Sequence, residues 1–221
     1  MGAVDRPVAG NDNKIPSKQA SQGSPCLTGT QGTPNASMAA SPTSVADICV
    51  DSSAVVAAAT AAAAAAGADS IRLVEYQDER QLSDIMSLVD RDLSEPYSIF
   101  TYRYFLHNWP GLCFVAKAGE RTVGSIVCKA ERELEDDPLT GYIAMLAVDT
   151  AFRKHGIGTA LASKAIEAMR DLGCEEVVLE TEVTNQGALN LYTRLGFSKN
   201  ERLIKYYLNG VDAFRLKLWF R

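Results

Sequence analysis

A glycine-containing turn in the middle of the chain has the residue types needed to hold a phosphate group. The stretch 145–160 passes from an apolar run into a helical pattern. The first N–H groups of a helix are unpaired and carry partial positive charge, so they attract anions. Gly156 and Gly158 let the backbone approach phosphate oxygens closely, and Arg153 and Lys154 add positive charge at the rim. The pattern therefore predicts a pyrophosphate cradle.

The common nucleotide-binding motifs do not account for this turn. The dinucleotide fingerprint requires a third glycine at the position of Leu161, and the Gly-Lys-Ser/Thr of a P-loop is absent. What remains is Arg-x-x-Gly-x-Gly after an apolar strand. A second motif follows it further along the chain, with Asn185, then Leu191-Tyr192, then Leu195-Gly196-Phe197.

Hydrophobic periodicity indicates the elements that position these motifs. The apolar run 142–148 predicts a central strand buried on both faces, and Asn209-Gly210 predicts a tight turn between the last two strands. The order predicts a mixed α/β fold, with a largely antiparallel twisted sheet of about seven strands flanked by about four helices. Strands are expected at 71–76, 112–118, 122–130, 142–148, 175–182, 197–207 and 213–220, and helices at 79–93, 99–108, 156–172 and 185–195.

Aromatic residues divide the chain into two parts. Residues 1–70 contain no Phe, Tyr or Trp and five of the eight prolines, whereas 71–221 hold all the aromatic residues. A segment without large apolar side chains cannot offset the entropy lost on ordering. We therefore expect a disordered low-complexity tail at 1–70 and one folded domain at 71–221. The alanine-rich run 54–68 is too short to span a membrane and is expected to be a linker.

Charge and cysteine content exclude several classes of protein. The net charge is −5 and no basic footprint for nucleic acid is visible, so direct nucleic-acid binding is not expected. The five cysteines show neither a CxxC pair nor metal-ligand spacing with histidine, so no metal site is predicted. The sequence lacks the patterns of a secretory signal and of N-myristoylation. We expect a cytoplasmic protein without membrane association.

The two motifs together resemble the GNAT acetyltransferase superfamily. Five further stretches resemble the catalytic subunits of NatC N-terminal acetyltransferase complexes. The resemblance covers about 71–221 and none of 1–70. The five stretches are Leu93–Ser98, Tyr102–Phe105, Gly141–Val148, Leu179–Val183 and Tyr206–Ala213.

The resemblance implies acetyl-CoA as co-substrate and no metal. The backbone of Leu146, Ala147 and Val148 would pair with the pantetheine arm, and one N–H there would polarise the thioester carbonyl. Asn185 would lie beside the thiol arm, and Tyr192 would protonate the leaving thiolate. The pyrophosphate would be held by the loop and the helix start, at Arg153, Lys154, His155, Gly156, Ile157, Gly158 and Thr159.

The acceptor amine needs a base, because an α-ammonium with a pKa near ~8 must lose a proton before it attacks. Glu180 and Glu182 lie on the strand before Asn185, and only one of them is expected to point into a cleft. The resemblance favours Glu180 by its spacing from Tyr192. Glu95, between the first two helices, is the second candidate and would otherwise bind the ammonium or the first backbone amide.

The resemblance also implies the acceptor, which is the N-terminus of nascent proteins that begin with Met and a large hydrophobic residue. A pocket of Pro96, Tyr97, Ile99, Tyr206 and Tyr207 would suit such a side chain, because aromatic walls bind apolar groups and phenols bind peptide backbone. Since neighbouring strand residues alternate faces, one of the last two tyrosines is expected in the core.

Two other functions compete with this interpretation. A GNAT enzyme can act on lysine side chains or small-molecule amines, and a non-catalytic module can bind acyl-CoA without turnover. The Ser94-Glu-Pro-Tyr97 and Tyr206-Tyr207 stretches, which suit a peptide end, argue against the first. The presence of Arg153, Glu180 and Tyr192 argues against the second. The resemblance further implies a large auxiliary subunit, a small Sm-like subunit, and ribosome association through these partners.

Overall fold

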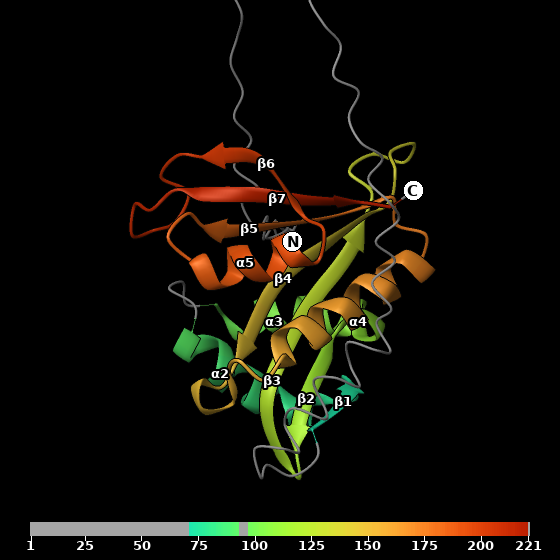
Figure 1. The fold of residues 1–221 in the computed structure, drawn as a ribbon. Coiled ribbons are helices and arrows are strands. Elements are labelled where there is room, and N and C mark those ends of the chain that lie inside the picture. The colour runs from blue at the N-terminus through green and yellow to red at the C-terminus, as the bar shows by residue number, and fades with distance from the viewer. Residues whose placement is uncertain (1–70, 93–96, 221) are drawn as a thin grey trace, which may run out of the picture. The chain divides into compact units, whose positions relative to one another are not determined.

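The computed structural model describes residues 71–92 and 97–220, which form a single seven-stranded sheet in the order β1-β2-β3-β4-β5-β7-β6 (Figure 1). Every neighbouring pair is antiparallel except β4 and β5, which are parallel. This confirms the predicted mixed α/β fold. The strands are β1 (Ile71–Glu75), β2 (Phe114–Ala118), β3 (Arg121–Glu131), β4 (Thr140–Val148), β5 (Glu176–Glu182), β6 (Ser198–Leu203) and β7 (Ala213–Trp219).

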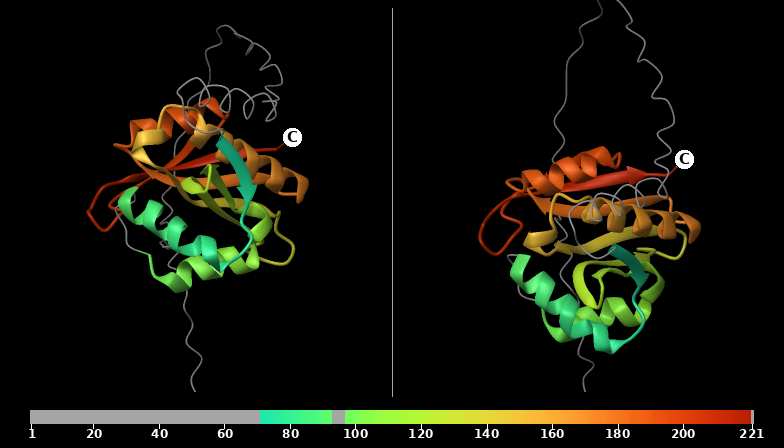
Figure 2. Two further views of the ribbon diagram at one scale, coloured as in Figure 1. Left: turned by 90° about the horizontal axis from the view of Figure 1, so that it is seen from below. Right: turned by 60° about the horizontal axis from the view of Figure 1, so that its bottom comes forward.

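Within the described residues, four α-helices cover the two faces of the sheet (Figure 2). Helices α2 and α3 pack on one face through a cluster that includes Ile85, Tyr102 and Met145, and α4 and α5 pack on the other through Leu161, Leu179 and Tyr192. None of the helices in this part of the chain has the length and apolarity needed to cross a membrane. The helices are α2 (Leu82–Asp92), α3 (Ile99–Asn108), α4 (Ile157–Asp171) and α5 (Gln186–Arg194).

Strands β4 and β5 separate soon after they pair. They are hydrogen-bonded only where Thr140–Tyr142 lies beside Glu176–Val178, and beyond that point they diverge (Figure 1). At the paired end Gly141 lets α4 approach closely, because a Cβ there would lie 2.5 Å from Met169 Sδ. The β3–β4 register shifts between Val127 and Cys128, and such a bulge bends and twists a strand away from its neighbour. The divergence opens the sheet at its centre.

The bulge also changes which face the side chains of β4 occupy. Tyr142 and Ala144 pack toward the α2–α3 cluster, and so do Met145 and Ala147 after the shift. Residues along β4 alternate between buried and half-buried. Ile143 is buried in the α4–α5 cluster, so β4 is covered on both faces as expected, and its half-buried residues arise because one edge of the strand borders the opening.

The connection between β6 and β7 differs from the predicted tight hairpin. Strand β6 ends at Leu203 and β7 begins at Ala213, so residues 204–212 form a loop. Asp212 fixes this loop by accepting hydrogen bonds from Lys205 N at 2.8 Å and Arg202 Nε at 2.9 Å. Lys205 has a φ of 50°, outside the range of a strand. These local bonds explain why the strand stops before residues 206 and 207.

Candidate active site

The separation of β4 from β5 opens a cleft of about 1080 Å³. Its walls come from β4, β5, the start of α4, one side of α5 and the β6–β7 loop. The structure thus brings together most of the predicted site residues. Those that line the cleft are Tyr97, Leu146, Val148, Arg153, Lys154, Gly156, Ile157, Gly158, Thr159, Glu180, Asn185, Tyr192, Tyr206 and Tyr207.

The loop before α4 has the geometry of an anion site. Gly156 has a φ of 79° and is the N-cap of α4, and Ala160 N donates to Gly156 O at 2.9 Å. The N–H groups of the three residues between them precede the first intrahelical bond, and all three residues line the cleft. A Cβ at Gly158 would lie 3.2 Å from Leu191 Cδ1, which is a tight contact, so glycine leaves more room at this wall than a larger residue would. The helix start therefore fits a phosphate-bearing ligand.

Side chains next to this loop hold its shape. Asp149 accepts from Ala151 N at 3.0 Å and from Arg121 Nη2 at 2.6 Å, and these bonds lower its pKa. Arg153 Nε donates to Val148 O at 3.0 Å, which leaves an exposed cation beside the glycines. His155 does not line the cleft, and its Nδ1 is buried without a hydrogen-bond partner among the described residues.

One edge of β4 is open toward the cleft. Beyond Tyr142, no strand of the described residues pairs with this edge. Leu146 and Val148 line the cleft, whereas the side chain of Ala147 is buried against the α2–α3 cluster. Backbone N–H and C=O groups here are available to an extended ligand, as they are at any unpaired strand edge.

Tyr192 lies on α5, on the side of the cleft that faces α4. Its ring packs edge to face on Phe197 with centroids 5.3 Å apart, and its hydroxyl has no hydrogen bond within the described part of the chain. Burial raises the pKa of Tyr192 well above its usual range, so the phenol keeps its proton. Asn185 caps the same helix, with its Oδ1 accepting from Ala188 N at 3.0 Å.

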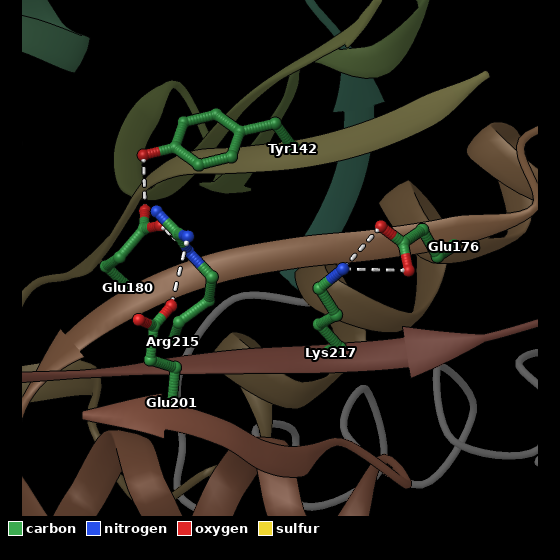
Figure 3. Close-up of polar contacts among 6 residues, drawn as sticks. All are labelled: Tyr142, Glu176, Glu180, Glu201, Arg215 and Lys217. Carbon is green, nitrogen blue, oxygen red and sulfur yellow. Dashed lines mark hydrogen bonds and ion pairs between the residues drawn. The ribbon is translucent and has the colours of Figure 1, made fainter. Parts of the chain in front are cut away.

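Glu180 lies on the other side of the cleft, held at both carboxylate oxygens (Figure 3). Tyr142 Oη donates to Glu180 Oε2 at 2.8 Å, and Arg215 Nε donates to Glu180 Oε1 at 2.8 Å. Burial, followed by the charge of Glu180, raises the pKa of Tyr142 well above normal. Sequence reasoning missed both partners. Tyr142 has a weak signal as the one phenol in an apolar strand, whereas Arg215 depends on a strand pairing that the sequence does not reveal.

The β6–β7 loop forms a further wall and corrects two expectations. Tyr206 and Tyr207 lie in this loop and both line the cleft, so neither is a core residue of a strand. Only one of Glu180 and Glu182 was expected to point into the cleft, but both line it, because residues two apart on a strand share a face. Glu182 accepts from Asn209 Nδ2 at 3.1 Å and ties the loop to β5. Asn209 also accepts from Val211 N at 2.9 Å and was not predicted as a site residue.

Some predicted site residues are not placed in the cleft. Glu95 and Pro96 lie outside the described residues. Ile99 packs against the α2–α3 cluster and does not line the cleft, although Tyr97 does. In the described ranges, 71–92 and 97–220, no three His, Cys, Asp or Glu side chains gather in a way that would hold a metal ion.

Residues 82–197 match the Acetyltransferase (GNAT) family. The chain belongs to the GNAT acetyltransferase family. Among GNAT proteins it is 61% identical over 153 residues to N-alpha-acetyltransferase 30 of Xenopus laevis, which is 69% of this chain and 56% of that protein. It is 56% identical over 150 residues to N-alpha-acetyltransferase MAK3 of Arabidopsis thaliana, which is 68% of this chain and 78% of that protein.

A solved GNAT structure agrees with these relatives. The chain is similar to one chain of the crystal structure of the NatC complex bound to Gag peptide and CoA, with a TM-score of 0.65 and 45% identity over 68% of this chain and 99% of that chain. The predicted resemblance to NatC catalytic subunits is thereby confirmed. The match spans little more than half the length of the Xenopus relative, at 56%.

Proposed function

We propose that the chain transfers the acetyl group of acetyl-CoA to the α-amino group of proteins that begin with Met and a large hydrophobic residue, as the catalytic subunit of a NatC-type complex. One observation carries this proposal. The cleft passes through the sheet, with Glu180 on the α2–α3 side and Tyr192 on the α4–α5 side. An amine and a thioester can therefore reach one point from opposite faces of the sheet.

Acetyl-CoA, when bound, supplies a thioester whose acetyl carbon is open to attack by an amine. Its diphosphate would be held by the N–H groups at residues 157–159, with Arg153, Lys154 and the backbone around His155 at the rim. The open edge of β4 at 146–148 would bind the pantetheine arm and supply the N–H that polarises the carbonyl. Asn185 would border the thiol end.

Proton transfers are divided between the two sides of the cleft. Glu180 would take a proton from the α-ammonium, directly or through a water molecule, so that the neutral amine can attack. Tyr192, a neutral phenol, would donate its proton to the departing sulfur. The amine nitrogen loses two protons in all and the sulfur gains one, so one proton is released to solvent for each turnover. Glu95, in segment 93–96, stays the second candidate for contact with the amine.

The walls on the Glu180 side suit the start of a polypeptide. Tyr97, Tyr206 and Tyr207 provide aromatic surface for the large residue, and their hydroxyls suit peptide backbone. Pro96 would complete the pocket. The solved NatC complex at 45% identity is bound to a peptide and CoA, which supports a peptide acceptor for this chain.

Further parts of the proposal concern the setting of the enzyme. The chain would act in the cytosol with a large auxiliary subunit and a small Sm-like subunit, and would reach ribosomes through them rather than by binding nucleic acid itself. The catalytic domain would comprise residues 71–221, and the tail at 1–70 would not be needed for the chemistry.

The test uses the full chain with acetyl-CoA and follows release of free thiol. Three peptides are compared, one starting Met-Leu, one starting Ser-Glu, and one with a blocked N-terminus and an internal lysine. Release with the Met-Leu peptide alone is the expected result. Activity on the lysine peptide alone would overturn the N-terminal assignment. A chain that binds acetyl-CoA but releases no thiol, even with the auxiliary subunits added, would overturn the catalytic assignment.

A further inference from the structure

Three charged residues lie in a row across the last three strands of the sheet (Figure 3). Glu180 on β5 is the register partner of Arg215 on β7, and Arg215 is the register partner of Glu201 on β6. Their neighbours Leu179 and Leu216 are buried in the cluster beneath α4 and α5. Because strand residues alternate faces, the charged row lies on the opposite face, where Glu180 borders the cleft.

The contacts within this row are unequal. Arg215 Nε lies 2.8 Å from Glu180 Oε1, whereas Arg215 Nη1 lies 3.4 Å from Glu201 Oε2. The side chain of Glu180 is 7% exposed, that of Arg215 is 35% exposed and that of Glu201 is 53% exposed. A carboxylate this buried needs a partner for its charge, and a half-exposed arginine can supply one without losing all its hydration.

We propose that Arg215 is a positioning residue for the acetyl transfer, acting by fixing the carboxylate of Glu180 at the cleft; this inference rests on the proposed function. The guanidinium occupies one oxygen and the phenol of Tyr142 occupies the other, so the carboxylate has a single orientation. Each oxygen retains a lone pair for the amine or for a bridging water molecule. Arg215 itself does not line the cleft, so it would act through Glu180 and not by contact with a reactant.

Removal of Arg215 would leave Glu180 held only by Tyr142. The carboxylate could then rotate about its terminal torsions, and its buried charge would have no cation beside it. Rotation of the carboxylate, or movement of its uncompensated charge toward solvent, removes an oriented base from the cleft. We therefore expect the rate of transfer to fall more than the affinity for either substrate.

The neighbouring ion pair provides a matched control. Lys217, two residues further along β7, contacts Glu176 Oε1 at 2.9 Å on the same face and between the same two strands (Figure 3). Its side chain is 25% exposed and that of Glu176 is 17% exposed, so the pair is comparably buried. Neither residue lines the cleft. Loss of this pair disturbs the β5–β7 contact without disturbing Glu180.

The experiment compares the full chain with Arg215→Ala, Arg215→Lys and Lys217→Ala, with added auxiliary subunits if wild-type turnover requires them. Wild-type turnover is established first, so that its absence counts against the proposed function alone. For each variant kcat, the KM for a Met-Leu peptide, the KM for acetyl-CoA and the melting temperature are measured. The assay is then repeated with millimolar guanidinium, which can enter the partly exposed site of the deleted side chain.

We expect Arg215→Ala to lower kcat by roughly tenfold or more with both KM values within about threefold, and guanidinium to restore part of the rate. The kcat of Arg215→Lys should lie between the values for Arg215→Ala and the wild type, because lysine keeps the charge but not the planar geometry. Lys217→Ala should retain the wild-type kcat, although its melting temperature should change by about as much as that of Arg215→Ala. The proposal would be overturned if Arg215→Ala had the wild-type kcat. It would also be overturned if Arg215→Ala lost no more kcat than Lys217→Ala and guanidinium restored none of it. If Arg215→Ala does not fold, the kcat of Arg215→Lys is compared with that of Lys217→Ala by the same criterion.

Discussion

Tyr142 and Glu180 come from two strands that separate immediately beyond Tyr142, yet their side chains meet, with Tyr142 Oη donating to Glu180 Oε2 at 2.8 Å. The bond spans the mouth of the opening between β4 and β5. It links the strand whose open edge faces the cleft to the strand that carries the carboxylate. The divergence of the two strands thus creates the cleft and also leaves the phenol in reach of the proposed base.

Substitution at Glu180 tests the proposed base. Glu180→Gln keeps the size and one acceptor but cannot take a proton, so kcat is expected to fall by about 100-fold with the KM for acetyl-CoA unchanged. Tyr142→Phe removes one hydrogen bond but leaves Arg215 in contact, so a loss of only about threefold to tenfold is expected. Steady-state kinetics with a Met-Leu peptide measure both. A larger loss in Tyr142→Phe than in Glu180→Gln would contradict these roles.

The raised pKa of Tyr192 predicts the alkaline behaviour of the enzyme. Burial favours the neutral phenol, so Tyr192 loses its proton only above the reference value of about 10. The proton donor is therefore present at all lower pH values, and kcat should not decline up to about pH 10. Tyr192→Phe should lower kcat by about tenfold or more across the range. The measurement is the pH profile of kcat for both proteins. A decline in the wild-type kcat centred near pH 9 that is absent from Tyr192→Phe would contradict a Tyr192 that stays protonated up to about pH 10.

The glycine at the start of α4 allows a prediction about cofactor binding. A Cβ at residue 158 would lie 3.2 Å from Leu191 Cδ1 and 3.7 Å from Val148 Cγ2, and larger side chains would extend into the cleft. Gly158→Val should raise the KM for acetyl-CoA by about tenfold or more and leave the KM for peptide nearly unchanged. Gly111→Ala is the control, because its nearest neighbour would be Glu75 Oε1 at 3.5 Å. Equal effects of the two substitutions on the KM for acetyl-CoA would show that residue 158 does not form the wall of the cofactor site.

The tie between the β6–β7 loop and β5 predicts an effect on peptide binding. Asn209→Ala removes the bonds from Asn209 Nδ2 to Glu182 and from Val211 N to Asn209 Oδ1. The tyrosines at 206 and 207 would then be less well positioned, and the KM for a Met-Leu peptide should rise by roughly threefold to tenfold. Asn200→Ala, at an exposed position on β6, is the control. A rise in the KM for acetyl-CoA alone would contradict the placement of this loop on the peptide side of the cleft.

Local signals in the sequence were enough to predict the glycine turn before α4 and most elements. Gly156 and Gly158 mark a turn and a helix start whatever the rest of the chain does, and α4 begins at Ile157, one residue after the predicted start. Strand and helix periodicity predicted β5 and α5, whereas the resemblance to NatC catalytic subunits singled out Glu180 and Tyr192 on them. These features depend on residues close together along the chain, so sequence patterns reveal them.

The errors arose where side-chain hydrogen bonds and the order of strands in the sheet, rather than hydrophobic periodicity, decide the structure. The loop at 204–212 exists because Asp212 and Asn209 form bonds that compete with strand pairing, and Asn209-Gly210 alone suggested a tight turn. Arg215 reaches Glu180 only because β7 inserts between β5 and β6 in the sheet. The part of the cleft that holds the carboxylate was thus the least predictable part of the site.

The most direct test of the account determines where the acetyl group goes. A single peptide with a free Met-Leu N-terminus and one internal lysine is incubated with acetyl-CoA and either the full chain or Glu180→Gln, and the product is sequenced by tandem mass spectrometry. The account predicts acetyl on the α-nitrogen with the wild-type chain and about 100-fold less of it with the variant. Acetyl on the lysine Nζ, or equal α-acetylation by the two proteins, would contradict it.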